Sequence, residues 1–531
     1  MSQVDISHRH APARISSRSS GLIGWAGAAV VLAFAALLQA IGHLNGDDAW
    51  FLTFAEKFVD GQRAYVDVAD PNPPAAFIAY VPAVHIARLM ALRPECVLVA
   101  LTLCGALLST AAAGQVLRRA GLLGAAHMPA AASLAIYLCL VVPAFCFAER
   151  EHLVVLALLP FAAVLAARAA GQPVSLLSAL VAGAGAGLTI TFKPYFLLPV
   201  GLAWAVSLRP STEWLRRSLP EIAALVLVLA IHAGAVILFF PDYLAMFALA
   251  LDVYAPVRDH LLHLLASPLF LANASLLGAW LLLAGRHYRR RTQAIGSTRW
   301  QRGPREATLW ASAALARICA ALSLGFLATF VIQGKGWNNH ALPGIVFGLM
   351  ALAAEIQNAR QPTAGRNEAG ATAKFVFLPL LCAAPFLFGA VQLLSNGEEH
   401  RGLLAAVAQV APPRPKIAAL AEQLDFGHPL VRQLAGTWIG RRNCLWVSWG
   451  VKYLRRQGGL AAPAAARLAR DIDDDLQMFA QDVASGKPDI LLVESGELEA
   501  WARRQPALSG LFDGFAEAGH AGAIEIWRRK R

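Results

Sequence analysis

The sequence predicts a polytopic α-helical membrane protein, a bundle of about 11–13 spans, with a small α/β domain at its C-terminal end. Three observations lead to this fold class. Of the 531 residues, 57% are hydrophobic and only 15% are charged, which is not a composition of soluble domains. Many apolar runs reach the roughly 20 residues needed to cross about 30 Å of hydrocarbon. After residue 395, charged residues return to ordinary amounts and no long apolar run remains.

The net charge of +12 does not indicate a nucleic-acid-binding protein. Arginines and lysines collect in short loops between apolar runs, as they do on the cytoplasmic side of membrane proteins. We therefore expect membrane lipids, and no nucleic acid, as partners of this basic surface.

The chain divides into three parts by composition. Residues 1–20 form a basic cytoplasmic tail, residues 21–395 form the transmembrane module, and residues 396–531 form a domain outside the membrane. The first apolar run, 21–42, lacks a small-residue cleavage site, so we interpret it as a retained helix rather than a signal peptide.

The loop 43–73 follows the first span and lies on the far side of the membrane. Within it, 49–59 has phenylalanines at helical spacing and charges on the remaining surface. This pattern predicts an amphipathic helix along the membrane surface, with Asp47 as its N-cap. Prolines then break the chain, and Pro74 suits the first turn of a second span over 75–92.

Ten further spans follow from the apolar runs, at about 95–117, 127–146, 152–170, 174–192, 195–208, 220–240, 262–285, 308–332, 338–357 and 374–394. The arginine-rich loop 286–306 is expected to be cytoplasmic, but strict alternation places it outside. One crossing in the first half is therefore misassigned. We favour 95–117 as a hairpin or partly inserted segment, which places four basic residues together on the cytoplasmic side: Arg88, Arg93, Arg118 and Arg119.

The C-terminal domain is expected on the extracytoplasmic (periplasmic) side. The patterns at 417–424 and 462–479 are typical of helices, whereas 490–493 and 523–527 are typical of strands.

The first external loop concentrates acidic residues beside the membrane, beginning with the pair Asp47-Asp48. Carboxylates can hold a hard divalent cation, Mg²⁺ or Mn²⁺, and can act as the general base for a hydroxyl nucleophile. The alternative is structural, because Asp47 as a cap and Asp48 in the first turn both favour a helix start. The two roles are compatible, since a cap holds a carboxylate rigidly.

A second polar cluster, Glu149-Arg150-Glu151-His152, lies between two apolar spans, where polar groups are costly unless they serve a function. Glu149 and Glu151 could complete a metal site with Asp48, and Arg150 could contact a phosphate. The alternative is an interfacial turn with a local ion pair. Lys193 also lies between apolar runs, and it either meets an anionic phosphate or extends to the membrane surface.

The loop 333–340 carries a cation, amides, an indole and an imidazole within eight residues. Lys335, Trp337, Asn339 and His340 are candidates for substrate or phosphate binding, and Trp337 offers a face for a sugar ring. The alternative is an ordinary interfacial loop with an aromatic-belt tryptophan.

Taken in order, these motifs resemble the GT-C membrane glycosyltransferases, in particular the protein mannosyltransferases and lipid A aminoarabinose transferases. The resemblance covers roughly 21–395. It rests on Asp47-Asp48, Gly61, Tyr65, Asp67 and Pro73-Pro74, on Lys193-Pro194 after a glycine-rich helix, and on Lys335 with His340-Ala341-Leu342-Pro343. The chain departs from the family at Asn72, where many relatives carry lysine or histidine. It departs again at Ala148-Glu149-Arg150-Glu151, where many carry an aspartate.

The resemblance implies an inverting enzyme of the bacterial inner membrane that moves a sugar from a polyprenyl-phosphate donor to a hydroxyl of an envelope glycan, lipid or protein. Asp47 would take the proton of the attacking hydroxyl. The charge of the leaving phosphate would be met by Lys193, Arg150, Lys335 or a divalent cation.

Other interpretations remain open at this level. An O-antigen polymerase or ligase also moves lipid-linked glycans, but such enzymes depend on arginines in large late loops. A lipid or solute transporter needs ionisable residues in mid-span, whereas the acids here lie near span ends, at Glu95, Glu221 and Glu355. A catalytically inactive family member that acts as a scaffold is the third possibility.

Overall fold

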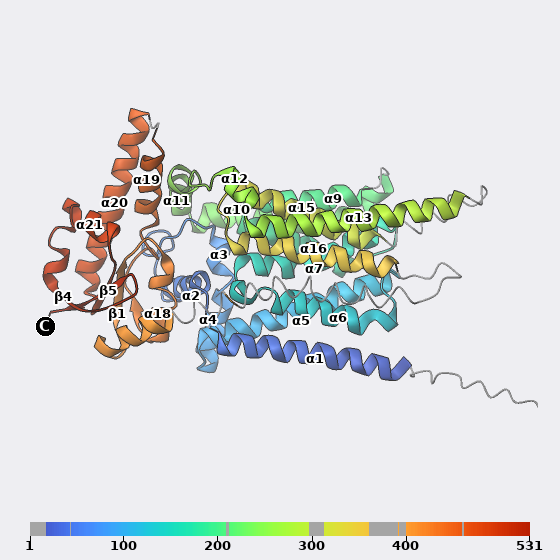
Figure 1. Cartoon of the computed structure of the whole chain (residues 1–531), viewed down its shortest axis with the longest axis horizontal. Helices are drawn as coiled ribbons and strands as arrows, with labels where there is room; N and C mark the ends of the chain where they lie inside the picture. Colours follow the sequence, from blue (N-terminus) through green and yellow to red (C-terminus); the bar gives the residue numbers. More distant parts are fainter. Residues whose placement is uncertain are drawn as a thin grey trace, which may run out of the picture.

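The computed structural model describes residues 17–42, 44–208, 212–296, 313–359, 391, 400–458 and 461–530. The molecule is elongated: a bundle of long helices forms most of its length, and a sheet domain lies beyond one end of the bundle (Figure 1). Most of the tail expected at 1–20 and nearly all of the span expected at 374–394 lie outside the described residues.

Long apolar helices form the bundle. Six of those described are long and apolar enough to cross a membrane: α5 (Pro94–Arg119), α7 (Arg150–Ala169), α10 (Thr212–Phe239), α13 (Pro268–Gly296), α15 (Ala314–Gln333) and α16 (Asn338–Ala359). Helix α1 (Ser17–Ile41) makes a seventh if it is counted together with α2 (Gly46–Val59), to which it is bent by 76°. The chain is thus a multi-pass membrane protein, as its composition indicates.

Shorter apolar helices complete the bundle: α6 (Met128–Ile136) with η2 (Tyr137–Val141), α8 (Leu176–Phe192), and η4 (Pro194–Phe196) with α9 (Leu197–Ser207). Helix α8 packs against both α7 and α10. A Cβ at Gly183 would lie 2.1 Å from the Glu221 carbonyl oxygen, and one at Gly185 would lie 2.4 Å from the Ala157 carbonyl oxygen. These glycines therefore allow the close helix contacts on which packing inside a membrane depends.

The span expected at 75–92 does not cross the bundle. It forms two short helices, α3 (Pro74–Ile78) and α4 (Val81–Met90), which lie between the bundle and the sheet domain (Figure 1). Arg88 pairs with Asp60 at 2.8 Å, so the segment ends on the side where it began. The chain breaks between α3 and α4 just before Pro82, because a proline inside a helix would interrupt it.

The expectation that 95–117 is a hairpin is wrong. Helix α5 is a continuous helix of 26 residues. Its first turn carries Glu95, which pairs with Arg432 of the C-terminal domain at 2.7 Å, and Arg118 and Arg119 lie in its last turn. Arg93 and Arg118 are therefore at opposite ends of the bundle. The misassigned crossing was 75–92.

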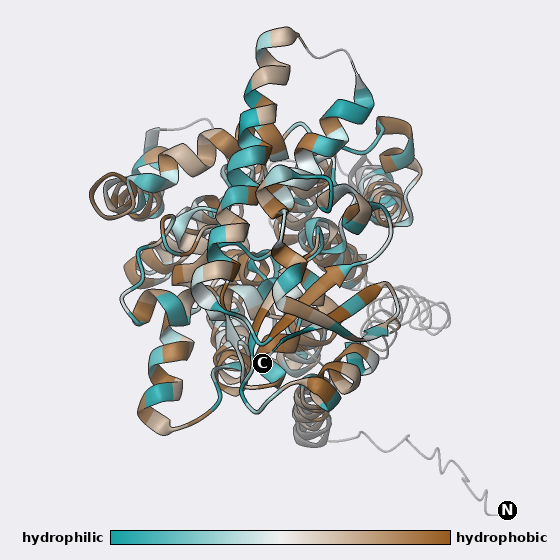
Figure 2. Ribbon diagram, turned by 90° about the vertical axis from the view of Figure 1, so that its left-hand side faces the viewer, coloured by the Kyte–Doolittle hydropathy of each residue, from teal (hydrophilic) through white to brown (hydrophobic). Residues whose placement is uncertain are grey.

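The C-terminal domain is built on a five-stranded sheet in the order β2-β1-β3-β5-β4. Its strands are β1 (Lys416–Leu420), β2 (Thr437–Trp438), β3 (Ile490–Glu494), β4 (Phe515–Ala521) and β5 (Ile524–Arg529). Strand β1 pairs in parallel with β2 and β3, while β5 is antiparallel to β3 and β4. Viewed from this end of the molecule, hydrophobic strands lie among helices with many hydrophilic residues (Figure 2).

The helix expected at 417–424 is instead strand β1 followed by a loop. Its alanine-rich run has high helix propensity, but β1 is buried on both faces between β2 and β3, where a continuous apolar strand is typical. The strands at 490–493 and 523–527 and the helix at 462–479 are confirmed, the last as part of α20 (Ala462–Gly486).

The two faces of the sheet contact different parts of the molecule. Leu491 and Val493 pack with Leu476 and Phe479 of α20. The alternate strand residues, such as Ile490 and Leu492, belong to the same hydrophobic core as the bundle. The sheet domain is therefore continuous with the membrane module.

Polar contacts fix this junction at α2. Arg432, which lies in α18 (Leu430–Gln433), donates to Glu56 as well as to Glu95. Lys57 donates to the Gly440 carbonyl at 2.8 Å, and the ring of His428 contacts Trp50 edge-on at 5.3 Å. The C-terminal domain thus holds the helix that carries the paired aspartates.

Candidate active site

A cavity of about 700 Å³ lies between the bundle and the C-terminal domain. Eight stretches of the chain line it: the start of α2 at 45–47, the loop 70–73, the turn at 145–150, the segment around Lys193, the helices at 243–255, the loop 333–340, and parts of the C-terminal domain at 422–425 and 443–449. This volume is in the range of small-molecule sites.

The N-terminus of α2 presents Asp47 to the cavity. Asn45, not Asp47, is the N-cap of this helix: its side-chain oxygen accepts from the Asp47 N–H at 2.7 Å. The sequence prediction was thus wrong by two residues, which leaves the Asp47 carboxylate free of capping. Its Oδ2 accepts from Arg150 at 3.0 Å, and its side chain is 24% exposed.

Asp48 points the other way and does not line the cavity. It is fully buried, and its Oδ1 accepts from the Tyr80 hydroxyl at 2.6 Å. Burial, opposed by the Tyr80 hydrogen bond, raises the pKa of Asp48 well above its usual range. Asp48 therefore anchors α2, while Asp47 is the member of the pair that can meet a substrate.

The run Glu149-Arg150-Glu151-His152 turns the chain into α7. Ala148 before it adopts φ +70°, a conformation that alanine rarely takes and that marks functional sites. His152 Nδ1 accepts from the Ala148 N–H, and the Tyr80 hydroxyl donates to the Ala148 carbonyl. His152 is thus a structural residue that stabilises the turn.

The other members of this run hold the site together. Glu149 accepts from the Asn45 side-chain amide, and Arg150 bridges Asp47 and the Asn72 side-chain oxygen. Burial, followed by the charge of Asp47, raises the pKa of Glu149 well above its usual range. Arg150 therefore fixes the orientation of the Asp47 carboxylate.

Lys193 is the centre of the third polar group. Its ammonium contacts the Glu151 carboxylate, His340 Nε2 at 3.0 Å and Gln333 Oε1 at 3.3 Å. The Lys193 side chain is 13% exposed and lines the cavity, whereas Glu151 is fully buried behind it. Burial lowers the pKa of Lys193, although Glu151 opposes that shift. The sequence alternative of a lysine that extends to the membrane surface does not apply.

Lys335 has different hydrogen-bond partners from those of Lys193. Its ammonium donates to the carbonyls of Tyr254 and Val257 and lies 4.0 Å from the centre of the Tyr254 ring. Burial, followed by the nearby Arg258, lowers the pKa of Lys335 to about 7. Trp337 connects this group to the previous one, with its ring 5.3 Å from that of His340.

The structure brings most of the predicted site residues to one cavity: Asp47, Glu149, Arg150, Lys193, Lys335, Trp337, Asn339 and His340. Asp48 and Glu151 lie behind its wall as partners of Tyr80 and Lys193. Sequence reasoning missed Asn45 and Tyr80, together with the C-terminal residues at 422–425 and 443–449. A polar residue at the start of a surface helix was a usable signal for Asn45, but nothing in the local sequence marks Tyr80.

The expected metal site is not preformed. In the part of the chain that the structure describes, no three histidine, cysteine, aspartate or glutamate side chains are grouped so as to hold a metal ion. Asp48, Glu149 and Glu151 each keep one buried oxygen without a partner, but their other oxygens bind Tyr80, Asn45 and Lys193. These residues do not fit a divalent cation as they stand, and no step below uses one.

No family model and no curated protein matches the chain. Among solved structures, the chain is similar to ArnT from Cupriavidus metallidurans in the apo state, with a TM-score of 0.58 and 14% identity over 96% of this chain and 98% of that one. It also matches the archaeal oligosaccharyltransferase AglB from Archaeoglobus fulgidus, in complex with an inhibitory peptide and a dolichol-phosphate, at a TM-score of 0.40 and 12% identity over 95% and 74%. The likeness to ArnT shows that the part of the chain that the structure describes, including the C-terminal domain, shares the overall fold of that protein.

Proposed function

We propose that this protein is an inverting glycosyltransferase that moves a sugar from a polyprenyl-phosphate donor to a hydroxyl acceptor. One observation carries the proposal: within a GT-C fold, a single cavity holds the carboxylate of Asp47 together with the cations Arg150 and Lys193. A base for the incoming hydroxyl, here Asp47 held by Arg150, and a cation for a leaving phosphate, here Lys193, are the two charged elements that this reaction needs.

A lipid-linked donor is supported by the apolar side of the same cavity. Phe192, Tyr195, Phe247 and Leu251 line it, and the last three are 39–50% exposed on the surface of the molecule. Tyr195 follows α8, and Phe247 lies in α11 (Asp242–Leu249), so the opening is at the bundle end beside the membrane. A polyprenyl tail can remain in the bilayer there while its phosphate reaches Lys193.

The proposed reaction is a single displacement. The oxygen of the acceptor hydroxyl attacks the anomeric carbon while Asp47 takes its proton. The bond between that carbon and the phosphate oxygen breaks, and its electron pair leaves with the polyprenyl phosphate. Because attack comes from the side opposite the leaving group, the anomeric configuration inverts. Arg150 orients Asp47 through the 3.0 Å ion pair, and Lys193 meets the negative charge that develops on the phosphate.

The remaining partners follow from this proposal. The protein would act in the bacterial inner membrane, with the C-terminal domain on the extracytoplasmic side, and its acceptor would be an envelope glycan, lipid or protein. Mg²⁺ or Mn²⁺ stays a prediction from the sequence. A titration with each ion during thermal unfolding tests that prediction independently of turnover, because a bound cation raises the melting temperature.

Transfer by purified protein tests the function. Radiolabelled polyprenyl-phosphate sugars are incubated with crude cell-envelope acceptor, and wild type is compared with Asp47→Asn. We expect the variant to lose about 10²- to 10⁴-fold of the turnover, because a positioned proton acceptor contributes that much. Asp60→Asn, at the exposed C-terminal end of the same helix, is the matched control. Equal transfer by wild type and Asp47→Asn contradicts the mechanism.

A further inference from the structure

Tyr80 lies behind the cavity wall, between the two segments that carry the proposed base and its cation. It is fully buried in the turn between α3 and α4, and it does not line the cavity. The proposed reaction gives this residue no chemical role. A buried hydroxyl is costly unless it is paired, so the partners of Tyr80 indicate what its hydroxyl does.

The Tyr80 hydroxyl connects the two segments. It lies 2.6 Å from Asp48 Oδ1 and 3.1 Å from the Ala148 carbonyl oxygen, and it donates to both. Asp48 is adjacent to Asp47 in α2, and Ala148 precedes Arg150 by two residues. One hydroxyl thus joins the neighbours of both members of the ion pair that faces the cavity.

The ring of Tyr80 reaches the same ion pair by a second route. It stacks on Phe51 with a ring distance of 5.5 Å and an interplanar angle of 26°. The Arg150 guanidinium lies 4.8 Å from the centre of the Phe51 ring, where the aromatic face attracts a cation. The stack of Tyr80, Phe51 and Arg150 therefore restricts the positions that the guanidinium can take.

The turn that Tyr80 binds needs support from its surroundings. The φ of +70° at Ala148 is unfavourable for alanine and persists only where neighbouring groups hold it. The Ala148 N–H donates to His152, and its carbonyl accepts from Tyr80, so both of its backbone polar groups are used in this way. Without the Tyr80 hydroxyl the turn can relax, which moves Arg150 relative to α2.

Another connection between the two segments runs along the cavity wall. Asn45 accepts from the Asp47 N–H, and its side-chain amide donates to Glu149. Both Asn45 and Glu149 line the cavity, so a bound substrate can compete for these contacts. The Tyr80 connection lies behind the wall and persists when a substrate is bound.

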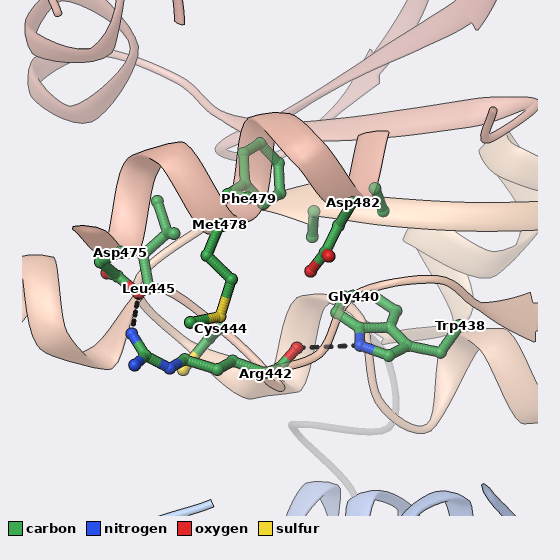
Figure 3. A pocket seen from close by; sticks show the side chains of 11 residues that line it. Trp438, Gly440, Arg442, Cys444, Leu445, Asp475, Met478, Phe479 and Asp482 are labelled. Carbon is green, nitrogen blue, oxygen red and sulfur yellow. Dashed lines mark hydrogen bonds and ion pairs between the residues drawn. The ribbon is translucent and has the colours of Figure 1, made fainter. Parts of the chain in front are cut away.

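The C-terminal domain holds α2 farther along the helix. Lys57, in the last turn of α2, donates to the Gly440 carbonyl. The segment that carries Gly440 is held against α20 by the ion pair between Arg442 and Asp475 (Figure 3). These contacts act on the last turn of α2, whereas Tyr80 acts on the first turn.

We propose that Tyr80 is a positioning residue for the transfer reaction: it fixes Asp47 and Arg150 relative to each other by joining Asp48 to the Ala148 carbonyl. This inference rests on the proposed function. In this role Asp48 contributes one oxygen, Oδ1, while its Oδ2 is buried without a partner. Asp48 therefore takes no part in the proton transfer.

Tyr80→Phe tests the role, because it removes the hydroxyl and keeps the ring on Phe51. We expect kcat per folded molecule to fall about 10²-fold, the cost of a displacement of roughly 1 Å at a reacting centre, with the donor and acceptor KM values changed less than about threefold. Tyr453→Phe is the matched control: it also removes a hydroxyl that donates to a backbone carbonyl, that of Arg258, but it does not line the cavity. A kcat of Tyr80→Phe equal to that of wild type overturns the proposal.

Substitutions at Asp48 separate positioning from chemistry. Asp48→Asn keeps an acceptor oxygen for Tyr80, and Asp48→Ala removes it. Burial raises the pKa of Asp48 well above its usual range, so the neutral amide is a close substitute for the carboxyl group. We expect Asp48→Asn to stay within about threefold of the wild-type kcat and Asp48→Ala to lose as much as Tyr80→Phe, with little further loss when the last two are combined. Equal losses in Asp48→Asn and Asp48→Ala overturn the proposal.

A measurement without turnover separates this inference from the proposed function. Hydrogen exchange is followed by mass spectrometry in the full chain, over 46–50 and 146–150. Tyr80→Phe should speed exchange in both segments, and Tyr453→Phe in neither; unchanged exchange in Tyr80→Phe overturns the connection. Transfer by Asp47→Asn equal to that of wild type contradicts the proposed reaction, whatever the exchange result. An inactive Asp47→Asn beside a fully active Tyr80→Phe contradicts the positioning role alone.

Discussion

The partner of each charged side chain determines what that side chain can do in the cavity. Glu151 is fully buried and bonds Lys193, and Arg150 holds Asp47. The sequence marked all four residues as polar groups beside apolar spans, but it did not show which carboxylate faces a substrate. That distinction depends on Tyr80 and Asn45, whose contacts with Asp48 and Glu149 are each separated by more than 30 residues along the chain.

The buried pair of Lys193 and Glu151 gives a prediction for stability. Lys193→Met leaves the Glu151 carboxylate buried without its cation, and we expect a loss of about 3–5 kcal/mol of unfolding free energy. The double variant with Glu151→Gln removes both charges and is expected to recover most of that loss while remaining inactive. Thermal unfolding in nanodiscs measures both. Equal destabilisation by the single and double variants contradicts the pairing.

The lowered pKa of Lys335 predicts a dependence of stability on pH. Its pKa is about 7 in the folded protein and 10.5 as the ordinary value, so between these values the unfolded chain binds more protons. The stability of wild type relative to Lys335→Met should therefore rise from about pH 7 to about pH 10, and stay constant below about pH 6. Other titrating groups are common to both proteins and cancel in the difference. A difference in melting temperature that does not change across this range contradicts the shift.

Asn72 shows how a departure from a family pattern is compensated. Many members of the family that the sequence resembles carry a cation before Pro-Pro, and this chain instead brings Arg150 to the Asn72 side chain. The positive charge is thus present beside Pro73, although it is supplied from α7. Residue-by-residue comparison of sequences could not find this, because the two residues are 78 positions apart.

Among the elements, helix α2 depends most on its surroundings. Its aromatic residues predicted a surface helix that lies along the membrane, but Trp50, Phe51, Leu52 and Phe54 are all fully buried between the bundle and the C-terminal domain. The pattern correctly indicated a helix and its approximate ends. The pattern did not indicate that the C-terminal domain covers the other face of this helix, because the residues that make those contacts lie after position 415.

Gly46 gives a prediction for this element. Gly46→Ala should displace the side chains of Asp425 and Leu424 that lie on the start of α2, because the new Cβ would lie 2.0 Å from Asp425 Oδ1 and 2.7 Å from a Leu424 methyl. We expect lower activity and faster proteolysis of the C-terminal domain. Gly105→Ala is the control, since no atom lies within 4 Å of its added Cβ. Partial recovery in Gly46→Ala with Asp425→Gly would identify the contact, and unchanged activity of Gly46→Ala contradicts it.

At the scale of the whole molecule, the class of fold was predictable from apolar length and composition. The number and direction of crossings were less so, because 75–92 is apolar but divided by prolines into two short helices. Hydropathy alone cannot separate a span from apolar helices that pack between two domains. The ion pair between Arg88, near the end of this segment, and Asp60, which precedes it, shows that the segment returns to the bundle end that faces the C-terminal domain.

This path predicts which sites are accessible from the same side of the membrane. Single cysteines introduced at Asp60 and Arg88 should be labelled by an impermeant maleimide from one side, and a cysteine at Arg118 only from the other. The background carries Cys96→Ser and Cys104→Ser, because both native thiols are exposed in the structure. Labelling of the Asp60 and Arg88 positions from opposite sides contradicts the path.

Arg432 predicts how the two parts of the molecule depend on each other. Arg432→Ala leaves Glu56 and Glu95 without their shared cation, so we expect faster hydrogen exchange in α2 and reduced transfer activity. Arg456→Ala is the control, because its ion pair with Glu497 is exposed on the outer surface of the domain. Unchanged exchange in α2 contradicts the proposed dependence.

The inner face of the sheet has a practical consequence for the production of the C-terminal domain by itself. Ile490 and Leu492 share one core with helices that would then be missing. A fragment that begins near residue 415 would therefore expose an apolar surface patch. Such a fragment should aggregate or bind detergent micelles rather than remain monodisperse in solution. Antibodies intended for the native protein are therefore better raised against the intact chain in a lipid environment.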